Sequence, residues 1–346
     1  MAYTTINKPS ATAFNTKLYT GNYSTNVITG VGFQSDMTWI KSRSSAQSHV
    51  ITDAVRGITK NIYPNSTDGQ DTVSSGITAF GSDGFTLGAN NGFNENSATF
   101  ASWNWKANGA GSANTDGSIN TTYTSANTTA GFSIIQYTGN GSAGATIGHG
   151  LGTVPKMFIV KKISSTGAWN VYHEKIGNTG GISLDLTGGT DTNIGYWNNT
   201  SPTSSVLSLG SSAQVNGSGV TYICYVFSEK QGYSKFSSYT GNGNADGTFS
   251  YTGFKPAFVM LKKTSGTGNW QLFDNKRAGY NPDNDVLRPN LSNVECTSCV
   301  EIDMLSNGYK LKNTDGDGNT SGGTYIYMAF AEAPLVGTNG VTAKAR

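Results

Sequence analysis

The tetrapeptide "YTGN" occurs three times in this chain, at Tyr19–Asn22, Tyr137–Asn140 and Tyr239–Asn242. Each copy is followed by an apolar run that leads to a lysine, at Lys41, Lys161 and Lys262 respectively. Aligning the copies on that lysine also aligns three aromatic stretches, "FASWNWK" (100–106), "YICYVFS" (222–228) and "YIYMAFA" (325–331). Repetition at this spacing indicates one structural module copied three times, with roughly 100 residues in each copy.

Each module has the composition of an all-β domain. Its apolar or alternating runs are short and are bounded by Gly, Asn, Asp or Pro, which is typical of the strands and turns of a β-sandwich. The stretches "GSDGFTL" (81–87) and "LSNGYKL" (305–311) place Asp-Gly or Asn-Gly between two such runs, and this predicts tight hairpins. We therefore expect three tandem, homologous β-sandwich domains.

The repeats also predict the domain boundaries. The first domain covers residues 1–107, the second 131–231 and the third 232–337, followed by a C-terminal tail at 338–346. Residues 108–130 are rich in Gly, Ser, Thr and Asn and hold almost no large apolar side chain, so we expect a flexible or extended linker. The second and third domains are close in sequence and are expected to abut.

Charge and cysteine content argue against several classes of protein. Only 13% of the 346 residues are charged and the formal net charge is +2, so nucleic-acid binding is not expected. The sequence shows no membrane span and no signal-peptide pattern. We therefore expect synthesis in the cytoplasm and no insertion into a membrane. Three cysteines are too few for a disulfide framework, and we interpret Cys296 and Cys299 as two small loop residues.

Aspartate and arginine recur three residues apart at the same register of two modules, as Asp53 with Arg56 and Asp274 with Arg277. The second module has His173 and Ile176 at these positions. A carboxylate and a guanidinium three residues apart after a strand can fix a loop by a bidentate, charge-assisted hydrogen bond. We interpret the two pairs as structural salt bridges.

The stretch "NTDGDGNTSGG" (313–323) is a candidate ion site. It places oxygen-bearing side chains at alternate positions, namely Asn313, Asp315, Asp317 and Asn319. Calcium loops use this spacing to aim oxygens at one centre, although the glutamate that closes an EF-hand loop is missing. A structural calcium ion is one interpretation and the polar filling of a hairpin is the other. No other cofactor is expected.

The stretch "GYWNNTSP" (195–202) is the best candidate for contact with a glycan or another receptor. Carbohydrate recognition requires exposed aromatic faces beside amide groups, and both are combined in Tyr196, Trp197, Asn198 and Asn199. The alternative is that the two aromatic rings only anchor the loop. The other tryptophans fall in strand patterns, and we expect them to be buried.

No catalytic constellation is evident in the sequence. It has no G-x-S-x-G nucleophile elbow, and its histidines lack the H-E-x-x-H spacing of zinc hydrolases. The "YTGN" stretches lack the pattern of a phosphate-binding loop, so we interpret their glycines as turn residues. We expect no enzymatic activity. A glycan depolymerase remains an alternative, and it would require two carboxylates roughly 5 to 10 Å apart.

The chain also resembles a known family. The similarity is carried by "MAYTTINKPSATAFNTKLYTGN" (1–22), "GVGFQSDMTWIKSRSSAQSHVITDAVRGITK" (30–60) and "GYSKFSSYTGN" (232–242) together with "LSNGYKL" (305–311). These stretches are similar to a widespread, uncharacterised family of proteins from marine tailed bacteriophages, including phages of cyanobacteria and of abundant ocean bacteria. The similarity covers nearly the whole chain, from Tyr3 to Glu332.

The resemblance implies a virion component with modules similar to concanavalin or jelly-roll sandwiches. We therefore expect a tail fibre or appendage protein that acts in host-surface adhesion, or alternatively a head fibre, collar or capsid-decoration protein without a ligand. Expected partners are other virion proteins, further copies of the chain in a symmetric homo-oligomer, and a host-surface glycan or protein. The first domain is expected to dock on the particle, because the linker separates it from the other two.

Overall fold

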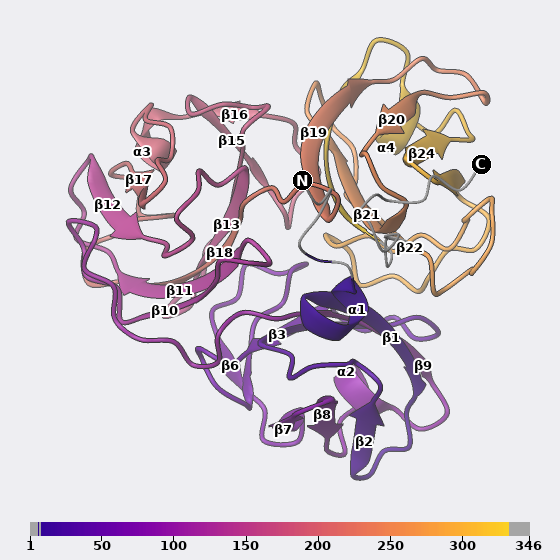
Figure 1. Cartoon of the computed structure of the whole chain (residues 1–346), viewed down its shortest axis with the longest axis horizontal. Helices are drawn as coiled ribbons and strands as arrows, with labels where there is room; N and C mark the ends of the chain where they lie inside the picture. Colours follow the sequence, from indigo (N-terminus) through magenta and orange to yellow (C-terminus); the bar gives the residue numbers. More distant parts are fainter. Residues whose placement is uncertain (1–5, 7, 332–346) are drawn as a thin grey trace, which may run out of the picture.

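The computed structural model describes residue 6 and residues 8–331, and the predicted C-terminal tail (338–346) lies outside them. The described chain is almost entirely antiparallel β-structure, which confirms the all-β fold class. Three groups of strands, one for each sequence repeat, surround a common centre (Figure 1). We call them unit 1 (14–105), unit 2 (123–227) and unit 3 (234–331). No helix in the described residues is long and apolar enough to cross a membrane.

Each unit builds one larger sheet with the same strand order. In unit 1 the order is β1-β9-β3-β4, with β1 (Phe14–Thr20), β3 (Met37–Ser42), β4 (Val50–Asp53) and β9 (Thr99–Trp105). In unit 2 it is β11-β18-β13-β14, with β11 (Phe132–Thr138), β13 (Met157–Lys162), β14 (Trp169–His173) and β18 (Thr221–Phe227). In unit 3 it is β19-β25-β21-β22, with β19 (Ser234–Thr240), β21 (Pro256–Lys263), β22 (Gln271–Asp274) and β25 (Thr324–Ala331).

A smaller sheet packs on one face of each larger sheet. Its strands are β2 (Asn26–Thr29), β7 (Ile77–Gly81) and β8 (Gly84–Leu87) in unit 1, β12 (Ala145–Gly148) and β17 (Val206–Leu209) in unit 2, and β20 (Phe249–Tyr251), β23 (Ile302–Leu305) and β24 (Gly308–Leu311) in unit 3. The two predicted hairpins are present as β7–β8 and β23–β24, with the glycine at the start of the second strand.

The remaining elements are short. They are the strands β5 (Lys60–Asn61), β6 (Asp71–Thr72), β10 (Tyr123–Asn127), β15 (Gly180–Ser183) and β16 (Asp191–Thr192), and the single-turn helices α1 (Pro9–Thr12), α2 (Asn91–Asn94), α3 (Ile194–Trp197) and α4 (Gly316–Asn319). Because β10, β15 and β16 extend the larger sheet of unit 2, that sheet is wider than its two counterparts.

Both faces of each larger sheet are buried. In β9, Phe100 packs toward the smaller sheet of unit 1, whereas Trp103 and Trp105 belong to an apolar cluster at the centre of the molecule. That central cluster takes residues from all three units. The units therefore share a core, and they are parts of one packed body rather than separate globules joined by linkers.

Three equivalent aromatic residues of the closing strands meet at the centre: Trp105, Phe227 and Phe330. Their ring centroids lie 6.5 Å apart for Trp105 and Phe227, 6.0 Å for Phe227 and Phe330, and 5.7 Å for Trp105 and Phe330. Aromatic pairs at such distances contribute about 0.5–1.5 kcal/mol each beyond the area that they bury. The three closing strands are thus related by a pseudo-threefold axis through this triad.

Hydrogen bonds between neighbouring units repeat around the same axis. They are Trp169 Nε1 to the carbonyl oxygen of Tyr63 (3.0 Å), Trp270 Nε1 to that of Ser183 (2.9 Å) and His49 Nε2 to that of Arg288 (3.0 Å). His49 is the donor, because its Nδ1 already accepts a hydrogen bond from Trp39 Nε1 at 2.9 Å. Unit 2 thus donates to unit 1, unit 3 to unit 2 and unit 1 to unit 3. These heterologous contacts close into a ring.

The lysines that mark the repeats are buried beside these interfaces. Nζ of Lys161 donates to the carbonyl oxygen of Thr67 in unit 1, and Nζ of Lys262 donates to that of Thr187 in unit 2, both at 3.0 Å. Nζ of Lys41 donates to carbonyl oxygens within its own unit. Burial lowers the pKa of each lysine to about 8. The recurring lysine therefore has a structural role.

Residues 108–130 were predicted to form a flexible or extended linker, and the structure shows a segment that is ordered by strand contacts. Strand β10 pairs with β11 along its whole length, and Ile119 forms a bridge with Ile147. Ile119 is also buried in the apolar core of unit 2. Ala126 packs against the same core, and the segment is therefore ordered against unit 2. Unit 1 is not set apart from the other units, which removes the reason for assigning the docking role to it.

Each "YTGN" turn is held by a buried asparagine that we did not identify from the sequence. The backbone N–H groups of Asn22, Asn140 and Asn242 donate to the Oδ1 atoms of Asn94, Asn216 and Asn319 at 2.9, 3.0 and 3.0 Å. In the first copy, Tyr19 donates to the carbonyl oxygen of Phe93, beside Asn94. A Cβ at Gly21 would lie 2.1 Å from the carbonyl oxygen of Glu95. The motif is therefore a clamp that joins the first strand to the segment before the closing strand.

Replacing the clamp asparagine should destabilise the fold. In Asn216→Ala, the Asn140 amide loses its acceptor, and the carbonyl oxygens of Ser142 and Gly210 lose their donor. We expect the free energy of unfolding, measured by urea titration, to fall by about 2–4 kcal/mol. The exposed Asn96→Ala is the control and should change this energy by less than about 0.5 kcal/mol. Equal effects of the two substitutions would contradict the clamp.

Candidate functional site

The two predicted salt bridges are present, and each lies at an interface between units. Nε of Arg56 is 2.6 Å from Oδ2 of Asp53, and Nε of Arg277 is 2.7 Å from Oδ2 of Asp274. Neither pair is bidentate, because the other guanidinium N–H groups of Arg56 and Arg277 bind further partners, carbonyl oxygens among them. Each carboxylate instead accepts a second bond from the neighbouring unit. The donors are Tyr225 Oη to Asp53 at 2.7 Å and Trp103 Nε1 to Asp274 at 2.9 Å.

His173 takes the place of the aspartate at the third interface. The residue of unit 3 that is equivalent to Tyr225 and Trp103 is Met328, whose side chain has no N–H or O–H donor. Nδ1 of His173 accepts from the backbone N–H of Lys175, so Nε2 carries the proton and donates to the carbonyl oxygen of Tyr327 at 3.2 Å. An imidazole donor therefore replaces a carboxylate acceptor where the neighbouring unit offers only an acceptor.

The side chains of the predicted calcium loop are directed to different protein partners. Asp315 caps α4 and accepts from Gln271 Nε2 at 2.7 Å, whereas Asp317 accepts from Asn269. Asn319 is the clamp residue of unit 3, and its amide donates to the carbonyl oxygen of Asn313. Within the described residues, no group of three or more His, Cys, Asp or Glu side chains is placed to hold a metal ion.

Trp197 is fully buried, which agrees with the alternative that this ring anchors the loop and not with an exposed binding face. Its Nε1 donates to the carbonyl oxygen of Gly180 at 2.9 Å, and its ring packs edge-on against Phe158. The turn α3 directs the indole into the apolar core of unit 2. Asn198 is half-buried and Asn199 is exposed, and both have left-handed backbone conformations.

Cys296 and Cys299 form a disulfide, whereas the sequence suggested only two small loop residues without a bond between them. The Cα atoms of Cys296 and Cys299 are 5.8 Å apart, a distance that suits this bond. The intervening turn brings the two thiols together, although the sequence spacing alone did not require it. The third cysteine, Cys224, is buried in unit 2.

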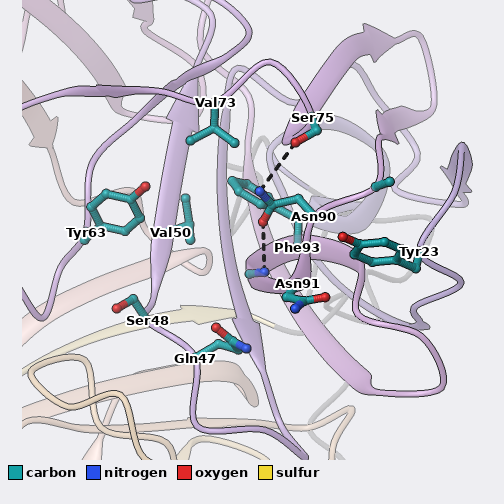
Figure 2. Close-up of a pocket in the computed structure, with 12 residues that line it drawn as sticks. Tyr23, Gln47, Ser48, Val50, Tyr63, Val73, Ser75, Asn90, Asn91 and Phe93 are labelled. Carbon is teal, nitrogen blue, oxygen red and sulfur yellow. Dashed lines mark hydrogen bonds between the residues drawn. The ribbon is translucent and has the colours of Figure 1, made fainter.

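Unit 1 contains an open hollow of about 580 Å³ between the start of β4 and the turn α2 (Figure 2). This volume is in the range of small-ligand sites, about 300–1,000 Å³. All of its lining residues are uncharged: Tyr23, Gln47, Ser48, Val50, Tyr63, Val73, Ser75, Ala89, Asn90, Asn91, Gly92 and Phe93. Figure 2 shows Tyr23 and Tyr63 on opposite sides of the hollow, with Asn90 between them.

Some polar groups of the hollow are fixed and others have no protein partner. Tyr63 donates to Asp71 at 3.1 Å, and burial together with that carboxylate raises the pKa of Tyr63 to about 12. Asn90 accepts from the backbone N–H of Gly92 at 2.9 Å. In the described part of the chain, the side-chain amides of Gln47 and Asn91 make no hydrogen bond. These two amides are therefore free to bind a ligand.

Tyr23 stands at the rim of the hollow in a strained conformation. Its φ is 50° and half of its surface is exposed, while its backbone N–H is held by the carbonyl oxygen of Asn94 at 2.8 Å. The equivalent residues of the other units are Gly141, with φ of 74°, and Gly243, with φ of 67°. A residue with a Cβ costs about 1–2 kcal/mol in this region, whereas glycine does not.

The equivalent place in unit 2 is narrower than in unit 1. Gln214 stands where unit 1 has Gly92, and its Oε1 accepts from the backbone N–H of Ala168 at 3.1 Å. A hollow of about 260 Å³ remains there, and Tyr196 is among its lining residues. Of the four residues predicted to bind a glycan, Tyr196 lines this hollow and the other three do not.

In unit 3 the same place is filled by side chains. Asn269 Nδ2 donates to Asp317 Oδ2 at 2.8 Å, and Gln271 Nε2 donates to Asp315 Oδ2 at 2.7 Å. The four equivalent residues of unit 1 are Ser48, Gly92, Val50 and Asn90. The three copies therefore range from open to closed, and the difference results from a few side chains on a shared backbone frame.

A family model described as a domain of unknown function, DUF7483, matches residues 8–334. Because this match spans nearly the whole chain, the protein belongs to the DUF7483 family. No curated protein and no solved structure matches the chain.

Neutral His173 and His49 should lose their stabilising effect as the pH falls from about 6.5 to about 4. Burial lowers the pKa of His173 from 6.5 to about 4, and it also lowers the pKa of His49. The unfolded chain therefore gains protons at these two residues while both folded imidazoles stay neutral, which lowers the free energy of unfolding, by at most about 3 kcal/mol for His173. Asp283 acts in the opposite direction, because burial raises the pKa of its carboxyl to about 7 and the folded state is favoured as this group is protonated. Urea titrations near both ends of the range should therefore compare His173→Gln with the wild type, and the wild type should lose more stability, or gain less, than the variant. The same change in both would contradict this account.

Removal of calcium should leave the melting temperature unchanged, because Asp315, Asp317 and Asn319 are already bound to protein partners. The measurement compares thermal unfolding in excess chelator and in added calcium chloride. A melting temperature that rises with calcium, and no longer does so in Asp315→Asn, would instead establish an ion site in this loop.

Proposed function

We propose that this DUF7483 protein is a structural component of a tailed-phage particle, most simply a tail fibre or appendage, that adheres to the host surface. Two arguments support the proposal. The sequence resembles phage virion proteins over nearly its whole length, and the chain presents an open hollow on a rigid frame. The hollow of unit 1 carries the adhesive part of the proposal, because its mixture of tyrosines, amides and hydroxyls is typical of recognition surfaces.

The frame suits adhesion because it fixes the position of the hollow. The clamp holds the turn that carries Tyr23, and the hydrogen bond from Trp169 to Tyr63 fixes the opposite wall from unit 2. Little conformational entropy would be lost when a ligand binds to walls that are already ordered. We therefore assign the host-facing role to unit 1, and docking on the particle to another part of the ring.

The second candidate is an architectural protein, such as a head fibre, collar or decoration protein, without a host ligand. The closed site of unit 3 favours this second candidate, because hydrogen-bonded side chains fill the place of the hollow in that unit. A depolymerase has no comparable support. The lining of the unit 1 hollow offers no carboxylate, whereas glycoside hydrolysis requires a pair of them.

Adhesion can be tested with the whole purified chain and cells of the bacterial host. The labelled protein should bind the cells saturably in flow cytometry, and an excess of unlabelled protein should slow adsorption of the phage. Antibodies against the chain should label intact particles in electron micrographs. Labelled particles without any cell binding would favour the architectural candidate, and particles that lack the chain would overturn the proposal.

A further inference from the structure

We propose that the hollow of unit 1 is a binding site for an uncharged saccharide, with Tyr23 as its main stacking residue. This inference rests on the proposed adhesive function and names the class of ligand and the residues that recognise it. The argument has three parts: the strain at Tyr23, the chemistry of the lining residues and the closure of the equivalent site in unit 3.

The strain at Tyr23 has no compensation in the apolar packing of the protein. Its ring belongs to none of the three apolar clusters among the described residues, and half of its surface is exposed. Glycine would fit the backbone better, and units 2 and 3 have Gly141 and Gly243 there. Residues that are held in unfavourable conformations cluster at binding sites and active sites. The tyrosine at this position is therefore best explained by a contact with something outside the chain.

The lining residues select a neutral ligand with many hydroxyl groups. A tyrosine face stacks on the apolar face of a sugar ring, and amides such as those of Gln47 and Asn91 can donate to and accept from its hydroxyls. The lining contains no lysine or arginine that would bind a phosphate, sulfate or uronate group. It also contains no carboxylate that would attract a cationic ligand. An uncharged saccharide fits these groups better than an anionic one.

In unit 3, side chains of the protein fill the place that is open in unit 1. Two amide side chains, Asn269 and Gln271, reach across the gap to Asp317 and Asp315 and bind them at 2.8 and 2.7 Å. The two sides of this gap are therefore close enough for polar side chains to bridge it by hydrogen bonds. In unit 1 the shorter Ser48, Val50 and Gly92 leave that space to a ligand.

The first test uses Tyr23→Gly in the full chain. We expect the variant to melt at a higher temperature than the wild type, because the strain is relieved, and to bind its saccharide about tenfold or more weakly. The exposed Tyr251→Ser in unit 3 is the matched control and should change neither quantity. A purely structural tyrosine would give the opposite sign for stability, so a lower melting temperature of Tyr23→Gly would overturn the inference.

The probe is an array of neutral and acidic bacterial oligosaccharides, followed by calorimetric titration of the strongest hit. Binding to neutral members that is lost in Tyr23→Gly supports the inference. Binding only to acidic members, or no binding to any member, overturns it. Cell binding by the wild type that Tyr23→Gly retains would also overturn it while leaving the adhesive function intact, whereas absence of cell binding by the wild type would count against that function itself.

A second variant tests whether the ligand occupies the hollow by closing the hollow without changing Tyr23. It transfers the closed arrangement of unit 3 into unit 1 through four substitutions: Ser48→Asn, Val50→Gln, Asn90→Asp and Gly92→Asp. Because unit 3 accommodates these pairs, the variant should fold with an unchanged circular dichroism spectrum and should lose saccharide binding. Binding that persists in the folded variant would show that the ligand lies elsewhere.

Discussion

The contact among Trp105, Phe227 and Phe330 is the constraint on which the rest of the structure depends. These rings come from the same position of three closing strands. They can meet only if each larger sheet turns toward one axis the face that its smaller sheet does not cover. That arrangement buries both faces of each sheet and makes every contact between units heterologous. The three copies therefore form a closed ring, the arrangement that a symmetric trimer would have, within a single chain.

A ring of three similar units allows its members to diverge without loss of the frame. The interfaces differ in chemistry, since Asp53 and Asp274 accept from the neighbouring unit whereas His173 donates to it. The hollows differ in the same way, from open in unit 1 to filled in unit 3. The stability supplied by the shared core can offset the cost of a strained residue such as Tyr23 in one unit. Divergence between copies is therefore a better guide to function here than the features that they share.

Much of the local structure could be predicted from the sequence, because the repeats place equivalent residues in register. The clamp asparagines could also have been found in this way, since each precedes the first aromatic residue of its closing strand by the same spacing. The burial of Trp197 and the packing of residues 108–130 were hard to predict for a common reason. A polar, glycine-rich neighbourhood resembles an exposed loop in sequence, but single apolar side chains within it, such as Trp197 and Ile119, are drawn into the core of unit 2.

By itself, the sequence determined the all-β class, the threefold repetition and the two aspartate and arginine pairs. All of these follow from residue spacing along the chain. Only the tertiary structure decided that the units share one core, that Trp197 is buried and that Tyr23 faces an open hollow. These facts depend on contacts between residues of different units or of distant strands, and no local pattern encodes such contacts. The "YTGN" turn is an example of both. Its recurrence in the sequence aligns the three repeats, whereas the left-handed conformation of the next residue, Tyr23, is evident only in the folded chain.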